Sequence, residues 1–349
     1  MGRERISVST PTVSFLAVGD VYLRRPDPAS AFRHFDGLFR SANLRFCNLE
    51  GPCSHLGTPT IGKYITIGMQ PTVVPALKAV GFDLVAFANN HALDYGYEAF
   101  LDTLERLDAA GIARIGGGRD LAEARRPVIL ERNGLRVGCL AYAATIPWGY
   151  EAAEGRPGIT PIRVQTYYEP RYQIMSEQPG MPARVVNVIH PEDLATLVSE
   201  VQQLKKEAHA VIVSFHWGVA FLPDPAPYQP ELAHAVVEAG ADLVLGHHPH
   251  VLQGVEVYRG VPIFYSLSNF VFDRENPRFG EETMLVLAEF GPDGLARTWA
   301  YPALLPRGGD PRPADTGEGA AINSLLERLS AGMNSRFQRE GERIEILAA

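Results

Sequence analysis

The chain has 349 residues, a length that fits two domains or one large α/β domain. Hydrophobic residues make up 46% of it and charged residues 21%, values close to globular averages, which exclude a disordered or fibrous chain. A net charge of −8, from 32 basic and 40 acidic residues, argues against general binding to nucleic acid or anionic membranes. Three cysteines are too few for a disulfide framework, and their spacing fits no zinc motif: Cys47, Cys53 and Cys139.

The N-terminal residues 1–12 carry a basic start followed by Ser, Thr and Pro. They lack the apolar run that a signal peptide needs. Nowhere does the sequence contain about 18 consecutive apolar residues, the length that spans a bilayer. We therefore expect a flexible tail over residues 1–12, no membrane binding and a cytoplasmic location.

Short apolar segments that end in polar residues alternate with helical patterns in the first third of the chain. The segments and the polar residues that follow them are 13–18 with Gly19-Asp20, 43–48 with Leu49-Glu50, and 83–88 with Asn89-Asn90-His91. Helices are predicted over residues 72–80 and 97–110. This alternation is typical of a mainly parallel sheet, in which ligand sites lie beyond the carboxyl ends of the strands.

The same alternation returns later in the chain. Helices are predicted over 191–206 and 229–239, and the strands that follow them, 210–215 and 243–245, run into His216 and into His247-His248-Pro249-His250. Two hairpins are predicted at 128–142, around Asn133-Gly134, and at 251–265. A last strand pair is predicted over 283–290 and 296–304.

Residues 145–190 contain six prolines, and we expect no regular element there. A long irregular segment in a compact domain is often functional, so this one is predicted to cover the ligand site. The main domain is expected over residues 13–305. Residues 306–349 are expected to form a linker and a C-terminal helix that packs on the domain or on a partner, which leaves a homo-oligomer possible.

The polar residues at the predicted strand ends form a ligand set for a metal ion. Five of the ten histidines lie between positions 216 and 250. Carboxylate, amide and imidazole donors together suit Mn, Fe or Zn better than Ca or Mg. Such an ion activates water at neutral pH and polarises phosphoryl or carbonyl oxygens.

Six motifs in order resemble the CapA type, the poly-γ-glutamate capsule biosynthesis family within the calcineurin-like metallophosphoesterase superfamily. They are Gly19-Asp20-Val-Tyr-Leu, Asn48-Leu-Glu50-Gly, Asn89-Asn-His-Ala-Leu-Asp94-Tyr-Gly, His216-Trp-Gly, Gly246-His-His-Pro-His-Val-Leu-Gln-Gly254 and Ser266-Leu-Ser-Asn-Phe-Val-Phe272. The resemblance covers residues 13–290. It implies a four-layer α/β/β/α sandwich of two mixed sheets.

The resemblance also implies roles for single residues. The implied metal ligands, for one or two divalent ions, are Asp20, Glu50, Asn90, His216, His248 and His250. His91 resembles the histidine that contacts substrate or protonates a leaving group, and Asp94 orients it or caps the following helix. Phosphoesterases of the superfamily usually carry a histidine where this chain has Tyr22 and an aspartate where it has Glu50, and both changes are usual for CapA-like proteins.

Ser268, Asn269 and His247 are assigned to substrate binding, although turn or purely structural roles remain open for them. Purely structural roles are also open for some of the implied metal ligands. Asn90 and His91 are also suited to capping a helix, and His216 to a hydrogen-bonded place in the core.

The function implied is that of a metal-dependent hydrolase. Water activated by the metal would attack a phosphoester, or a γ-glutamyl or other amide, in a small anionic substrate of a biosynthetic pathway. The alternative is a non-hydrolytic, metal-containing component that binds intermediates or assists ligation in poly-γ-glutamate or amino-acid-derived metabolite synthesis. The Asn90-His91 pair favours the enzyme, because a pure binding module has little need of an acid beside a ligand.

Overall fold

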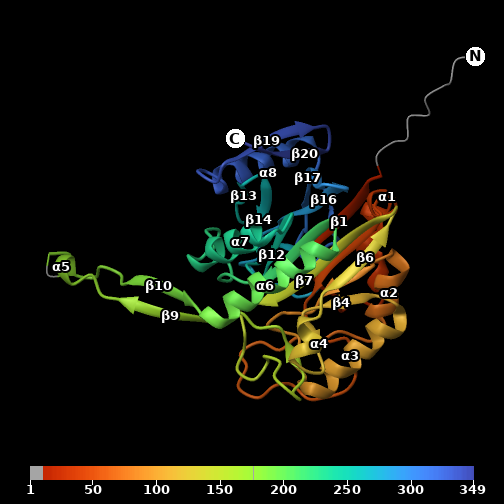
Figure 1. The fold of residues 1–349 in the computed structure, drawn as a ribbon, viewed down its shortest axis with the longest axis horizontal. Coiled ribbons are helices and arrows are strands. Elements are labelled where there is room, and N and C mark those ends of the chain that lie inside the picture. The colour runs from red at the N-terminus through yellow and green to blue at the C-terminus, as the bar shows by residue number, and fades with distance from the viewer. Residues whose placement is uncertain (1–10, 176) are drawn as a thin grey trace, which may run out of the picture.

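Strand β1 (Val13–Tyr22) lies inside the larger of two main sheets in the computed structural model, which describes residues 11–175 and 177–349 (Figure 1). All of its residues except Ser14 are buried, as expected of a strand that is covered on both faces. It pairs in parallel with β2 (Leu44–Leu49) and β15 (Asn269–Phe272), and antiparallel with β16 (Glu282–Gly291). The larger sheet is therefore mixed.

The strand order of the larger sheet is β19-β20-β17-β16-β1-β2-β3-β4, with β15 beside β1 and β18 beside β17. Its remaining strands are β3 (Leu84–Ala86), β4 (Ala113–Ile115), β17 (Gly294–Leu304), β18 (Arg312–Pro313), β19 (Ser335–Glu340) and β20 (Arg343–Ala348). The helices between its parallel strands are η1 (Pro28–Phe35), α1 (Asp36–Ser41), α2 (Val73–Val80) and α3 (Gly96–Ala110). The two predicted helices, α2 and α3, both end at a glycine in the left-handed region, Gly81 and Gly111.

The smaller sheet has the order β13-β14-β12-β11-β7-β6 and is also mixed. Its strands are β6 (Val128–Arg132), β7 (Leu135–Ala143), β11 (Ala210–His216), β12 (Leu243–His247), β13 (Val255–Tyr258) and β14 (Val261–Phe264). The hairpin predicted at Asn133-Gly134 joins β6 to β7, with φ angles of 54° and 76° at the two turn residues. Both angles are positive, as a type I′ turn requires.

The two sheets share one hydrophobic core. Along β11, Ala210 and Ile212 belong to the core that includes β1 and β2, whereas Val211 and Val213 belong to a second core. The second core is formed with α6 (Pro191–Glu207) and α7 (Tyr228–Ala239), which cover the outer face of the smaller sheet. The predicted mixed α/β class with two mixed sheets is confirmed. Within the described residues, every helix is too short or too polar to span a lipid bilayer.

Residues 145–190 differ from the expectation of an irregular segment. They contain β8 (Gly158–Ile159), β9 (Val164–Glu169), α5 (Tyr172–Met175) and β10 (Arg184–Ile189). β9 and β10 form an antiparallel hairpin that projects away from both sheets (Figure 1), and β8 pairs with β5 (Gly117–Gly118), which precedes α4 (Leu121–Arg125). The prolines lie outside β9 and β10, where they do not interrupt the ladder, and the Val- and Tyr-containing runs between them favour strands.

The C-terminal segment also contains more than the predicted linker and helix. Helix α8 (Thr316–Leu329) begins with a capping box between Asp315 and Glu318, and its Ile322 and Leu326 are buried in the main core. The strands β19 and β20 then extend the larger sheet beside β17. Of the two alternatives left open, α8 packs on its own domain.

Candidate metal centre

Three buried side chains from both sheets converge at the carboxyl ends of their strands. Asp20 lies near the end of β1, Glu50 follows β2, and His216 is the last residue of β11. One ligand atom from each of the three lies within 4.8 Å of the others. The convergence predicted from the strand ends therefore brings these three residues together.

Close backbone packing holds Asp20 in this position. The amide of Asp20 donates to the carbonyl of Ser268 at 3.1 Å. A Cβ atom at the preceding Gly19 would lie 2.0 Å from that same carbonyl oxygen, so no larger residue fits there. Glycine at position 19 is thus required for β1 and the loop before β15 to approach each other.

The other three predicted ligands surround this cluster. Asn90 Oδ1 lies 2.9 Å from His216 Nε2. His250 Nε2 is 3.8 Å from Glu50 Oε1, and its Nδ1 is 3.8 Å from Asp20 Oδ2. The backbone amide of His248 donates to Asp20 Oδ2 at 3.2 Å, and its ring centroid lies 4.9 Å from that of His216. All six predicted ligands therefore border one centre.

The polar atoms of this centre fit a divalent cation. Within the described part of the chain, both carboxylate oxygens of Glu50 and Nδ1 of His248 are buried without a hydrogen-bond partner. Burial raises the pKa of Glu50 well above its usual range, and the negative charge of Asp20 raises it further. A bound cation would stabilise the two buried acids, Asp20 and Glu50, and the unpaired nitrogen of His248, because all three can coordinate it.

The imidazoles are held in the neutral form that binds metals. Burial lowers the pKa of His216 well below its usual value, and the neighbouring His248 lowers it further. Burial, followed by the charge of His250, lowers the pKa of His248 to about 3. Burial opposes ionisation of Asp20 as well, but the adjacent His247 outweighs it and holds the pKa of that carboxyl below its ordinary value. One carboxylate and neutral imidazoles are thus ready as ligands.

His91 lies at the edge of the centre and is oriented by Asp94. Its Nδ1 is 2.6 Å from Asp94 Oδ2, and its Nε2 is 3.8 Å from Glu50 Oε1. Asp94 is fully buried, and its carboxylate also accepts hydrogen bonds from the amide of Ile67 at 2.7 Å, from the Tyr150 hydroxyl at 3.0 Å and from Lys63 Nζ. Of the two roles expected for Asp94, the contacts match the one that orients His91.

The residues assigned to substrate binding lie deeper than expected. His247 is buried against Asp20, with Nδ1 3.2 Å from Asp20 Oδ1, and against the ring of Phe46. Asn269 is buried too, and its Oδ1 lies 2.8 Å from His250 Nδ1. Ser268 is buried with φ of 64° in the loop whose carbonyl binds the Asp20 amide. These three residues thus contact Asp20 or His250, which are two of the predicted ligands.

A cavity of about 280 Å³ opens in front of the centre. Its floor includes Asn90, His91, His248 and His250, and its other walls come from three segments of the chain. These lining residues are Lys63, Tyr64, Ile65 and Ile67 before α2, Ala220 and Phe221 after β11, and Phe272, Arg274, Asn276, Arg278 and Phe279 at and after the end of β15. No residue of 145–190 is among those that line it, so the predicted cover over the site is not formed by the described part of that segment.

Sequence comparison assigns the chain to a family. Residues 14–274 match the family described as "Bacterial capsule synthesis protein PGA_cap". The chain belongs to this family. The predicted resemblance to CapA-type proteins is confirmed.

The relatives of this chain include two bacterial proteins named CapA. The chain is 32% identical over 247 residues to the "PGA biosynthesis protein CapA" of Bacillus subtilis (strain 168), an alignment that covers 70% of this chain and 57% of the relative. It is 29% identical to the "Capsule biosynthesis protein CapA" of Bacillus anthracis, covering 87% of this chain and 72% of the relative. A "Probable polyglutamine synthesis accessory protein" of Mycobacterium tuberculosis (strain CDC 1551 / Oshkosh) is 33% identical, covering 65% and 55%.

Three polar residues of the site were not predicted from the sequence. Lys63 lies in the segment between β2 and α2, whose hydrophobic pattern has neither the period of a helix nor that of a strand. Tyr150 precedes the projecting hairpin and reaches Asp94 across 56 positions. Asn48 donates to Asp20 Oδ1 at 2.9 Å, and its place in the Asn48-Leu-Glu50 motif was the one available signal.

Proposed function

We propose that this protein is a metal-dependent hydrolase. The observation that carries the proposal is the buried group of Asp20, Glu50 and His216, with ligand atoms within 4.8 Å of one another and both Glu50 oxygens unsatisfied within the described residues. A buried acid without partners is costly unless a cation or proton compensates it. The donor set favours Mn, Fe or Zn, as one ion or two.

Asp20, Glu50, Asn90, His216, His248 and His250 would hold the metal. When bound, a divalent ion supplies Lewis-acid polarisation of a substrate oxygen and a lower pKa for water. Asp20 and Glu50 contribute the negative charge and the imidazoles contribute neutral nitrogen donors. Asn48 and Asn269 keep Asp20 and His250 in orientation through their hydrogen bonds.

His91 is the proposed acid of the reaction. Asp94 fixes its Nδ1 side, which leaves Nε2 directed at the centre near Glu50. Burial lowers the pKa of His91 below its ordinary value, and the hydrogen bond and charge of Asp94 offset only part of that effect. A proton held on Nε2 can then pass to the oxygen or nitrogen of a leaving group that sits in the cavity.

The proposed substrate is a small anionic molecule of a biosynthetic pathway, cleaved at a phosphoester or at a γ-glutamyl or other amide bond. The relatives are named for PGA, capsule and polyglutamine synthesis, which favours glutamyl-containing molecules. A screen of the metal-loaded protein against phosphomonoesters, phosphodiesters and γ-glutamyl amides decides between the two bond types. Hydrolysis of only one of these compound classes would identify the type of bond that the protein cleaves.

The ligand assignment is tested by metal analysis. Protein purified without chelator should contain Mn, Fe or Zn, and His216→Ala should lose most of it because one nitrogen donor of the central group is gone. His234→Ala is the matched control, since His234 pairs with Glu256 away from the centre and its removal should leave the metal content unchanged. Full metal occupancy in folded His216→Ala protein would reject the assignment.

A second candidate is a non-hydrolytic, metal-containing component that binds intermediates or assists ligation. The word "accessory" in the name of the mycobacterial relative favours it. The two candidates differ in turnover: the accessory role predicts metal and ligand binding with no hydrolysis of any compound in the screen.

A further inference from the structure

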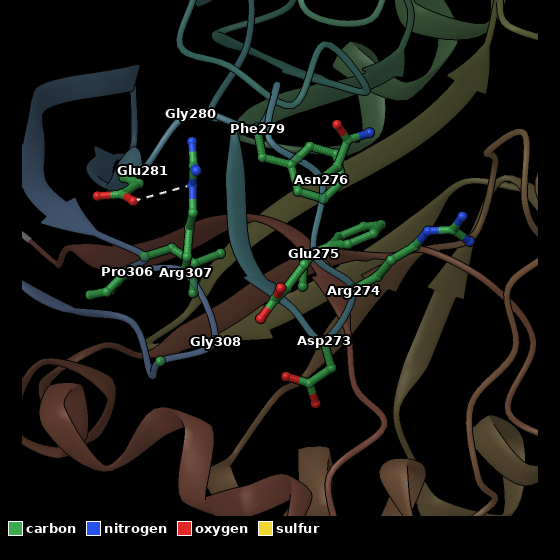
Figure 2. A pocket seen from close by; sticks show the side chains of 13 residues that line it. Asp273, Arg274, Glu275, Asn276, Phe279, Gly280, Glu281, Pro306, Arg307 and Gly308 are labelled. Carbon is green, nitrogen blue, oxygen red and sulfur yellow. Dashed lines mark ion pairs between the residues drawn. The ribbon is translucent and has the colours of Figure 1, made fainter.

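The loop between β15 and β16 separates its charged side chains by sign. Figure 2 shows Asp273 and Glu275 on one side of the loop and Arg274 extending to the other. Asp273 is bound by Arg25, whose Nε donates to Oδ2 at 3.0 Å. On the same side, Glu281 is paired with Arg307, with 3.6 Å between Oε1 and Nε. The acids Asp273, Glu275 and Glu281 line a separate cavity of about 230 Å³, whereas Arg274 lies between this cavity and the one over the candidate metal centre and lines both.

The arginines of this loop line the cavity over the candidate metal centre. Arg274 and Arg278 both belong to its wall. Across the chain described, 11–175 and 177–349, neither guanidinium makes an ion pair with a carboxylate, unlike Arg25 and Arg307. Two unneutralised guanidinium groups at one cavity mouth repel each other, and an anion between them relieves that repulsion.

An aromatic wall connects these arginines to the centre. The guanidinium of Arg278 lies over the ring of Phe221, 4.3 Å from its centroid. The Phe221 ring in turn lies 6.0 Å from that of His250, and Phe272 lies 5.2 Å from His250 on another side. The route from the metal ligand to the arginines thus passes along apolar ring faces, which a short hydrocarbon stem can contact.

We infer that Arg274 and Arg278 form a second subsite that binds an oxyanion of the substrate, a carboxylate or phosphate separated from the scissile bond by a short apolar stem. This inference rests on the proposed function, whose centre it extends. Guanidinium groups bind carboxylates and phosphates through paired, charge-assisted hydrogen bonds. Lys63 does not contribute to this subsite in the same way, because its ammonium is paired with Asp94.

The test measures anion binding by calorimetry, once with Mn²⁺ and once with chelator. The probes are γ-linked triglutamate, which carries carboxylates, and phenyl phosphate, which carries a phosphate on an apolar ring. Wild-type protein should bind at least one of them, and the double variant Arg274→Ala/Arg278→Ala should weaken that binding by at least about tenfold. The probe that binds identifies the oxyanion. Triglutamate with amidated carboxyl groups should bind both proteins equally.

The matched control is Arg259→Ala, which removes the same charge from the β13–β14 turn, where Arg259 pairs with Glu238. It should bind the probes as wild type does. Unchanged affinity in the double variant, an equal loss in Arg259→Ala, or no binding of either probe to wild type would overturn the subsite. A loss of anion binding in the double variant of a protein that neither holds metal nor hydrolyses would uphold the subsite and reject the hydrolase.

Discussion

Asp94 shows how a single buried residue organises the side of the centre that includes His91. It is fully buried, and four groups from separate parts of the chain donate to its carboxylate: His91, the amide of Ile67, Tyr150 and Lys63. These hydrogen bonds hold the Asp94 carboxylate in place. Its contact with Nδ1 of His91 orients the ring and leaves Nε2 directed toward Glu50.

His91→Ala separates proton transfer from metal binding. The variant should retain its metal, because His91 is not among the six proposed ligands, yet turnover should fall about 10²- to 10⁴-fold, the usual contribution of a general acid. Metal content and steady-state hydrolysis of the best screened substrate measure the two properties. Wild-type turnover in this variant would remove the acid role, and loss of the metal would make His91 a ligand instead.

The residues that the sequence could locate are those at strand ends. Asp20 and Glu50 lie at the ends of apolar runs, and parallel pairing of β1 with β2 brings those ends to one edge. His216 also ends an apolar run, but it comes from the smaller sheet and reaches the other two through the packing of the two sheets. Lys63 and Tyr150 could not be found in this way, because each lies in an irregular stretch and reaches the site through tertiary packing. The buried placement of His247 was equally hidden, since its orientation depends on the register between β12 and β11.

At the scale of elements, the loops of the centre contain unusual backbone conformations. His248, His250 and Ser268 have positive φ angles of 97°, 58° and 64°. Residues other than glycine seldom adopt this left-handed region of backbone conformation. Each such residue costs about 1–3 kcal/mol, and packing around it must offset that cost. The loops after β12 and before β15 therefore hold their side chains in positions that an unstrained loop would not provide.

Elements with a local signal were predictable, and elements without one were not. The Asn133-Gly134 turn and the helix at Pro191 carry their own chemistry, and both appear where expected. The β9–β10 hairpin was missed because surrounding prolines suggested an irregular chain. β19 was missed because most of its residues are charged or polar, and β20 because its place depends on pairing with β17, far away in the sequence.

Gly19→Ala tests the close packing between β1 and the loop before β15. The added Cβ would meet the Ser268 carbonyl oxygen at 2.0 Å, so one of the two backbones must move. We expect the free energy of unfolding to fall by about 3 kcal/mol or more, and metal affinity to fall as Asp20 shifts. Denaturant titration and metal analysis measure both.

Gly37→Ala is the control for this substitution. Gly37 lies in α1, where a new Cβ would meet no atom within 4 Å, so the variant should be unchanged or more stable by up to about 1 kcal/mol. Equal stability of the Gly19 and Gly37 variants would show that the backbone of β1 does not pack closely against the Ser268 carbonyl.

At the scale of the whole molecule, the centre joins the two sheets. Asp20 and Glu50 belong to the larger sheet, and His216 and the histidines after β12 belong to the smaller one. Without a cation, the junction holds unsatisfied carboxylate oxygens and neutral imidazoles at the rim of the shared core. A ligand that binds both sheets in the native state, and not the unfolded chain, must stabilise the entire fold.

Metal should therefore raise the thermal stability of the whole protein through this junction. At a concentration about 100 times its Kd, a metal ion adds about 2.7 kcal/mol, which corresponds to a rise in Tm of about 5 °C for a chain of this size. Differential scanning calorimetry of chelated protein, with and without Mn²⁺ or Zn²⁺, measures this rise. His216→Ala should show much less of it, because the ion then loses one of its ligands from the smaller sheet, whereas His234→Ala should show all of it. The same rise in His216→Ala would mean that the ion binds elsewhere, and no rise in wild type would mean that the two sheets are not linked by metal.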